Sequence, residues 1–155
     1  MPGPLSDAGA MAEALQQARL AQAAGEVPVG AVVLGPERTV IGRGHNAREA
    51  TADPTAHAEI VALREAAARL GTWRLDGTAL VVTLEPCTMC AGASVLARVA
   101  RLVFAADDLK AGAVGSLWDV VRDRRLNHRP EVIRGVLADE ASSLLQSFFQ
   151  ARRGG

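Results

Sequence analysis

Apolar and polar positions alternate along the chain in patterns that predict a regular series of helices and short strands. Near the start, apolar residues such as Met11, Leu15 and Ala18 recur at helical spacing, and Gly25 ends this helix. The further predicted elements, in chain order, are strands over 30–34 and 39–44, a helix over 57–70, a strand over 79–84, a helix over 86–97, strands over 99–105 and 131–136, and a helix over 138–153. The first helix spans 5–24 in this interpretation, and the first two strands form a β-hairpin.

This order of elements predicts an α/β fold. Strands that alternate with helices place helices on both faces of a largely parallel sheet, and the crossovers are right-handed. The hairpin near the start adds antiparallel pairing, so the sheet is mixed. We therefore expect a three-layer α/β/α sandwich with a five-stranded mixed sheet. With 155 residues, of which 49% are hydrophobic, we expect one domain over 1–155.

Composition narrows the possible partners. The 17 basic and 17 acidic residues cancel, so the summed field does not attract nucleic acid or a membrane surface, and any such contact needs a local patch. Aromatic residues make up only 3% of the chain, which argues against a base-stacking platform. A signal peptide and a long apolar segment are both absent from the sequence pattern, so we expect a cytoplasmic protein with no membrane contact.

The two cysteines lie three residues apart, a spacing typical of metal or redox chemistry rather than of a disulfide framework. Cys87 and Cys90 follow Pro86, and we expect both thiols in the first turn of a helix, on one side of it. His57 lies at the start of the other predicted helix and supplies a third ligand. Three protein ligands leave a fourth position for water, as in catalytic rather than structural zinc sites.

Glu59 lies two residues beyond His57 and points to a different side of the helical turn, so it need not bind the metal. We expect it to act as the proton shuttle, taking a proton from the attacking water and delivering it to the substrate. Such proton transfer typically contributes about 10²–10⁴-fold to a rate. Taken alone, His57 could instead be a capping or buried structural histidine, and Glu59 an ordinary acid of a first helical turn.

Two other functions remain open for the cysteine pair. A thioredoxin-like redox pair has the same C-x-x-C spacing, but it gives no role to the H-x-E sequence at His57 and Glu59. A non-catalytic, zinc-stabilised RNA-binding module would use the three ligands and have no need of Glu59. An H-x-E sequence followed by P-C-x-x-C is the known signature of zinc-dependent nucleobase deaminases.

From about Met11 to Arg153, the chain resembles bacterial tRNA-specific adenosine deaminases. The segments that carry the resemblance are 25–31 (GEVPVGA), Asn46, 53–60 (DPTAHAEI), 83–87 (TLEPC), 115–117 (GSL) and 126–128 (LNH). The D-P-T-A-H-A-E stretch is also found in guanine deaminases, so the later segments are the ones that distinguish the tRNA-specific enzymes from guanine deaminases. The resemblance implies a homodimer, with one zinc ion per subunit, that converts the wobble adenosine of an arginine tRNA anticodon to inosine. A free guanine or cytidine deaminase is the alternative.

The resemblance also implies how substrate is bound. The implied substrate-binding residues are Val29, Gly30, Ala31, Asn46, Pro86, Asp108 and Lys110. Asn46 would hydrogen-bond the flipped nucleoside, and Asp108 and Lys110 would meet the anticodon loop. Without the resemblance, Asn46 is a turn residue and Asp108 a solvated acid. We further expect a dimer to gather basic residues into one rim around the RNA: Arg98, Arg101, Lys110, Arg122, Arg124, Arg125, Arg152 and Arg153.

Overall fold

The computed structural model describes residues 3–153, and residues 1–2 and 154–155 of the predicted domain lie outside this range. Within it lie five strands and four longer helices, as the sequence pattern predicts, together with one four-residue helix that the pattern does not predict. In chain order they are α1 (Asp7–Ala23), β1 (Gly30–Leu34), β2 (Val40–His45), α2 (Arg48–Thr51), α3 (Ala58–Leu70), β3 (Ala79–Leu84), α4 (Thr88–Leu96), β4 (Arg101–Ala106), β5 (Glu131–Arg134) and α5 (Ala138–Arg153).

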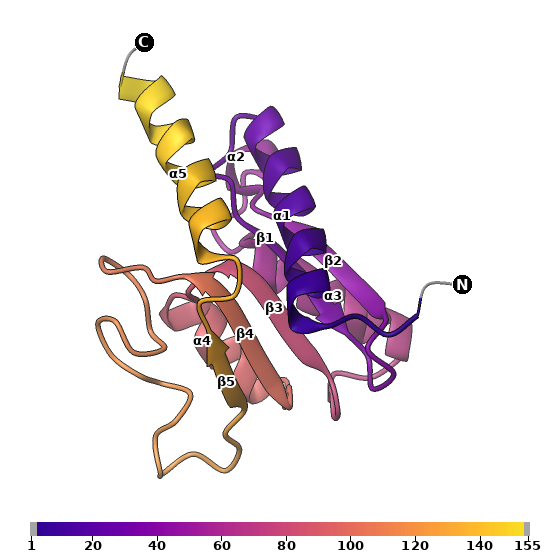
Figure 1. The fold of residues 1–155 in the computed structure, drawn as a ribbon. Coiled ribbons are helices and arrows are strands. Elements are labelled where there is room, and N and C mark those ends of the chain that lie inside the picture. Colours follow the sequence, from indigo (N-terminus) through magenta and orange to yellow (C-terminus); the bar gives the residue numbers. More distant parts are fainter. Residues whose placement is uncertain (1–2, 154–155) are drawn as a thin grey trace.

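The strands form one mixed sheet in the order β2-β1-β3-β4-β5 (Figure 1). β1 runs antiparallel to both β2 and β3, whereas β3, β4 and β5 are parallel to one another. The hairpin and the pairing of β1 with β3 are therefore antiparallel. The crossover through α4 makes β3 and β4 parallel, and the connection over residues 107–130 makes β4 and β5 parallel. This arrangement confirms the predicted five-stranded mixed sheet.

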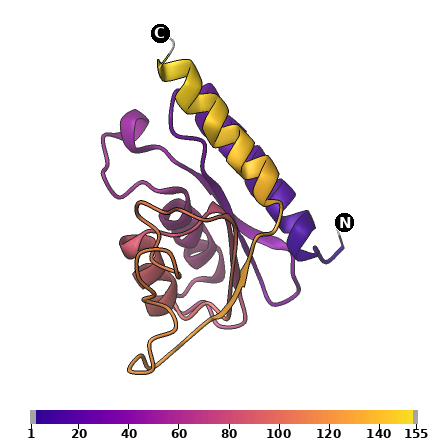
Figure 2. The ribbon, with the colours of Figure 1, turned by 60° about the vertical axis from the view of Figure 1, so that its left-hand side comes forward.

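Helices cover both faces of this sheet (Figure 2). Successive strand residues point to opposite faces, so each strand contributes to two apolar clusters. On one face, Val33 and Phe104 pack with the buried residues of α3 and α4. On the other face, Val32 and Val103 pack with those of α1 and with Ala141 of α5. The three-layer α/β/α sandwich is thus confirmed, and its core consists mainly of aliphatic side chains, among which the ring of Phe104 is fully buried.

Glycines in β2 allow α3 to lie directly against the sheet. A Cβ atom at Gly42 would clash with the carbonyl oxygen of Ala62, and one at Gly44 would clash with that of Ala58. The alternation of strand side chains places both glycines on the same face, opposite consecutive turns of α3. This close contact fixes the first turn of α3, and therefore the position of His57 at its N-cap.

The helix that carries the cysteines begins later than predicted. α4 starts at Thr88, and Cys87 is its N-cap residue with extended backbone, so Pro86 precedes the helix instead of starting it. Glu85 and Ala113 explain this boundary, because the N–H of Glu85 donates to Ala106 and the carbonyl of Pro86 accepts from Ala113. These bonds keep the chain extended up to Cys87.

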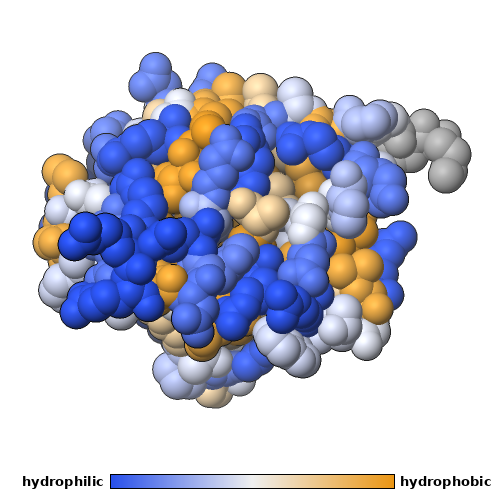
Figure 3. All heavy atoms as spheres, turned by 90° about the horizontal axis from the view of Figure 1, so that it is seen from below, coloured by the Kyte–Doolittle hydropathy of each residue, from blue (hydrophilic) through white to orange (hydrophobic). Residues whose placement is uncertain are grey.

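Within residues 3–153, no helix has the length and apolar character that crossing a membrane requires. The face seen from below the view of Figure 1 is mostly hydrophilic, with apolar side chains between the polar ones (Figure 3). The long connection between β4 and β5 contains no regular helix.

Candidate metal centre and active site

The predicted site residues collect at one edge of the sheet. Because β1 is antiparallel to β3, the start of β1 lies beside the end of β3, and the end of β2 lies beside the start of β1. Val29 before β1, Asn46 after β2, Cys87 after β3 and Asp108 after β4 therefore meet at this edge. Ligand sites in open α/β sheets form in the same kind of place, beyond the carboxyl ends of parallel strands.

His57, Cys87 and Cys90 converge at this edge as a possible metal site. Nδ1 of His57 lies 3.6 Å from Sγ of Cys87 and 3.5 Å from Sγ of Cys90. The ligand atoms all lie within 4.8 Å of one another. Tetrahedral zinc with its usual bond lengths would separate a nitrogen and a sulfur ligand by about 3.5–3.6 Å. The three side chains are therefore already at the spacing that a zinc ion requires.

The electrostatics of these three side chains also favour a cation. Hydrogen bonds from Cys90 and His57 lower the pKa of the Cys87 thiol to about 3. The contact with Cys87, together with burial, raises the pKa of the Cys90 thiol. The hydrogen bond to Cys87 also raises the pKa of His57. Without a metal ion, these groups thus favour Cys87 as a thiolate and Cys90 as a neutral thiol. A bound divalent cation would favour the thiolate form of both cysteines.

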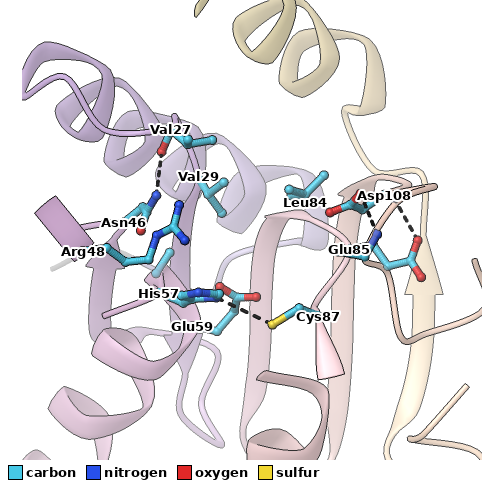
Figure 4. Close-up of a pocket in the computed structure, with 12 residues that line it drawn as sticks. Val27, Val29, Asn46, Arg48, His57, Glu59, Leu84, Glu85, Cys87 and Asp108 are labelled. Atoms are coloured by element: carbon cyan, nitrogen blue, oxygen red, sulfur yellow. Dashed lines mark hydrogen bonds between the residues drawn. The ribbon is translucent and has the colours of Figure 1, made fainter. Parts of the chain in front are cut away.

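Glu59 is buried beside the three candidate ligands. Its side chain is only 4% exposed, and its carboxylate lies next to the His57 ring, on the side facing Cys87 (Figure 4). Burial raises the pKa of this carboxyl group to about 7. Glu59 occupies the second position of α3, immediately after the N-cap and Ala58, which turns it away from the position that His57 takes. The geometry therefore leaves Glu59 free for proton transfer.

A pocket of about 250 Å³ opens above His57, Glu59 and Cys87. This volume lies just below the usual range of small-molecule sites, so the pocket suits one small ring system rather than a large ligand. Besides those three residues it is lined by Val27, Val29, Asn46, Arg48, Ala58, Leu84, Glu85, Asp108 and Ala111. Apolar side chains thus form the walls, with a few polar groups directed into the space (Figure 4).

Asn46 presents an unpaired acceptor at this pocket. Its side chain is 6% exposed, and its Nδ2 donates to the carbonyl of Val27 at 3.4 Å. Its Oδ1 is buried and has no hydrogen-bond partner among the described residues. An unpaired buried acceptor costs free energy, so it is typical of a position that a ligand donor completes.

Four other residues predicted to bind substrate do not line the pocket. Gly30 faces α1, where a Cβ would clash with the carbonyl oxygen of Ala14, so its lack of a side chain serves helix packing. Ala31 is fully buried in the core, and Pro86 is also buried. Lys110 is exposed, and its backbone N–H donates to Asp108. Gly30 and Ala31 are thus not among the residues that line this pocket, and their contact with substrate stays a prediction.

The sequence interpretation missed several residues of the pocket wall. Arg48 lies on the four-residue helix α2, between the predicted strand over 39–44 and the predicted helix over 57–70, where no helix is predicted. Glu26 holds this helix, because its buried carboxylate accepts hydrogen bonds from the N–H groups of Glu49 and Ala50. Glu85 was missed as well, although a charged residue directly after the apolar strand β3 is a signal of a special role.

Only some residues of the predicted basic rim are placed to contact RNA at the pocket. Arg101 is bound to Asp7 and Glu131 by ion pairs, and it lies at the start of β4, opposite the pocket edge. It therefore stabilises the fold and does not belong to a rim at the pocket. Arg122 and Arg125 lie on the connection between β4 and β5, and each pairs with a neighbouring aspartate.

Comparisons with known proteins agree with this geometry. Residues 5–106 match the model of the cytidine and deoxycytidylate deaminase zinc-binding region. A tRNA-specific adenosine deaminase of Haemophilus influenzae is 52% identical over 143 residues, which cover 92% of this chain and 83% of the relative.

Two solved structures are also similar. One, from a study of A-to-I editing by tRNA:A34 deaminases at the wobble position, has a TM-score of 0.84 and 43% identity, covering 88% of this chain and 98% of its own. A guanine deaminase of Nitrosomonas europaea has a TM-score of 0.79 and 30% identity, and the match covers 95% of this chain and 86% of the guanine deaminase chain. With His57, Cys87 and Cys90 placed to hold the metal, the chain belongs to the tRNA-specific adenosine deaminases, a family of zinc-dependent deaminases.

Proposed function

We propose that this protein hydrolyses the wobble adenosine of a tRNA anticodon to inosine and releases ammonia, and that its substrate is an arginine tRNA. The observation that carries the proposal is the combination of a three-ligand metal site and the buried Glu59 at the base of a pocket suited to one small ring system. The names of the relatives support the RNA substrate, and the arginine tRNA rests on the resemblance in the sequence alone.

The reaction replaces the amino group at C6 of adenine with oxygen from water. When bound, zinc supplies a Lewis acid that makes water nucleophilic at neutral pH. Glu59 takes a proton from the attacking water as the new C–O bond forms and gives it to the ring nitrogen beside C6. It then takes the remaining proton of the new hydroxyl group and gives it to the amino group, so that the C–N bond breaks, ammonia leaves and the C6 carbonyl of inosine forms. The burial of Glu59 excludes bulk water from these transfers.

Asn46, Val29 and Asp108 surround the bound nucleoside in this proposal. Val29 gives an apolar surface for the base, and the unpaired Oδ1 of Asn46 accepts a hydrogen bond from the nucleoside. Asp108 lies on the opposite wall, at the side where the rest of the anticodon loop would pass. Lys110, exposed next to it, is placed to approach a phosphate group. A base in a loop has little pairing to lose when it enters such a pocket.

A substrate panel tests the proposed function. Purified protein would be incubated with an arginine tRNA anticodon stem-loop, with the same stem-loop whose only adenosine lies outside the wobble position, and with free adenosine, guanine and cytidine. Mass spectrometry is expected to detect inosine only in the first RNA. Deamination of guanine or cytidine without inosine in the RNA would overturn the proposal, and it would favour the free-base alternative that the guanine deaminase likeness represents.

We also propose that the protein acts as a homodimer in the cytoplasm, where its metal-binding thiols stay reduced. Large apolar side chains are exposed on α4 and on the connection that follows β4, namely Met89, Leu96, Leu109, Leu117 and Trp118. Trp118 donates to Thr88 at the start of α4, so the two segments share one surface. Exposed apolar patches of this kind mark contact sites. Sedimentation is expected to give twice the mass of the chain, and the mass of one chain at micromolar concentration would contradict the dimer.

A further inference from the structure

We propose that Glu85 is a positioning residue that holds the loop over residues 107–116 as one wall of the substrate pocket. The inference rests on the proposed function, and it assigns a role to a buried carboxylate that the proton transfers do not use. Glu85 would act through the loop and not on the reacting atoms, so its loss should affect substrate binding more than the chemical step.

The first observation is the number of loop groups that meet this one carboxylate. Oε1 of Glu85 accepts from the backbone N–H of Asp108 at 3.0 Å and from the hydroxyl of Ser116. Oε2 accepts from the backbone N–H groups of Val114 at 3.0 Å and of Ser116 at 3.1 Å. Both ends of the loop are thus bound to a single side chain.

The second observation is that these hydrogen bonds, and no ion pair, compensate the buried charge. Glu85 is 2% exposed, and no salt bridge to it occurs within residues 3–153. A buried charge satisfied in this way depends on every donor of the loop, because removing a donor leaves the charge undersolvated.

The third observation is how closely the loop is wrapped around the carboxyl group. A Cβ atom at Gly112 would clash with the carboxyl group of Glu85 and with the carbonyl oxygen of Asp108. The N–H of Gly112 donates to that same carbonyl at 2.8 Å, and Ala113 donates to Pro86 at 2.9 Å. The backbone therefore leaves no room for the loop to shift while the carboxylate stays in place.

This arrangement connects the loop to both sides of the active site. Asp108 and Ala111 are the loop residues that line the pocket, and Glu85 itself also lines it. Cys87, a candidate metal ligand, lies only two residues beyond Glu85 in the chain. One short segment after β3 thus sets the distance between the metal site and the wall that faces Val29 and Asn46 (Figure 4).

The chemistry of glutamine makes the test specific. In Glu85→Gln, the amide NH₂ can replace only one of the two carboxylate oxygens. At the Oε2 position, the NH₂ group would face two backbone N–H donors, those of Val114 and Ser116, and it could accept a hydrogen bond from neither. At the Oε1 position, the NH₂ group would face only one backbone donor, the N–H of Asp108. The Ser116 hydroxyl can rotate there and accept a hydrogen bond from the NH₂ group. The second orientation costs less, so the variant should release the Asp108 end of the loop and keep the other end.

We expect Glu85→Gln to raise KM for the anticodon stem-loop about tenfold, as the loss of one charged hydrogen bond predicts, while kcat changes less than about threefold. The zinc content should stay at one ion per chain. Ser116→Ala removes a single hydroxyl bond and should raise KM about two- to threefold. Glu37→Gln is the matched control, because Glu37 is exposed in the turn between β1 and β2, and it should leave KM unchanged.

Hydrogen exchange gives a readout independent of activity. In Glu85→Gln, amides of residues 107–112 should exchange faster than in the parent, whereas amides of α3 should not change. A fall in kcat at unchanged KM, or unchanged exchange in this loop, would overturn the role of Glu85. If Glu85→Gln does not fold, Ser116→Ala decides by the same two measurements. A parent protein that makes no inosine would instead contradict the proposed function, and the exchange experiment would still test the loop.

Discussion

Replacing Glu59 with glutamine is expected to lower kcat for inosine formation by about 10²–10⁴-fold, the usual contribution of a general acid–base residue. Glutamine has nearly the same shape but cannot take up and release a proton at neutral pH. Because Glu59 is buried beside the candidate ligands and turned away from the ligand position of His57, KM and zinc content should stay close to those of the parent. Single-turnover assays with the stem-loop, together with metal analysis, measure both.

Glu65→Gln provides the matched control for this experiment. Glu65 lies on the same helix, α3, but it is exposed, so the same chemical change there should leave kcat unaltered. If Glu59→Gln kept full turnover, Glu59 would not be the proton shuttle. If the variant lost zinc, Glu59 would instead support the metal site.

The same variant separates the enzyme from the non-catalytic alternative. A zinc-stabilised RNA-binding module would hold RNA and metal through residues that Glu59→Gln leaves intact, so the variant would behave like the parent in every assay. A redox pair is already disfavoured by the structure, because His57 lies 3.5–3.6 Å from both sulfurs of the C-x-x-C sequence and gives them a third partner. A thiol pair that serves only electron transfer has no need of such a ligand set.

Much of the fold could be predicted because it depends on local patterns. The closing helix α5 has the predicted bounds, and the apolar runs of β1 and β3 correspond to the observed strands. The candidate metal ligands could be predicted because their spacing along the chain reflects the coordination chemistry of zinc. Such features need no knowledge of the distant parts of the chain.

The pocket walls could not be predicted, because long-range hydrogen bonds determine them. Helix α2 has four residues, and it depends on Glu26, more than twenty residues earlier in the chain. The loop that carries Asp108 depends on Glu85 in the same way. Gly30 shows the converse case, since the absence of its side chain gives α1 room to pack against β1, and the sequence pattern alone does not reveal this contact. In each case, a side chain or its absence acts on a segment that lies remote in sequence.

Removing zinc is expected to lower both activity and stability. A ligand that binds only the folded chain contributes about 4 kcal/mol to unfolding free energy when its concentration is a thousand times its Kd. For a chain of this size, that corresponds to a fall in Tm of about 8–16 °C on chelation. The sheet and the cluster under α1 lie away from the metal, so the circular dichroism spectrum of the folded state should persist. Adding zinc should restore both properties, whereas magnesium, which prefers oxygen ligands, should not.

Two variants divide this effect into its parts. Cys90→Ala removes a fully buried ligand, so its Tm should already be low and should not respond to chelator or to zinc. Glu59→Gln should have a strongly reduced kcat and yet show the full zinc-dependent change in Tm, because its three ligands are intact. Scanning calorimetry with and without chelator measures all of these changes. Equal Tm values for chelated and zinc-loaded parent would contradict a metal held by His57, Cys87 and Cys90, whereas a zinc response in Cys90→Ala would remove Cys90 from the ligand set.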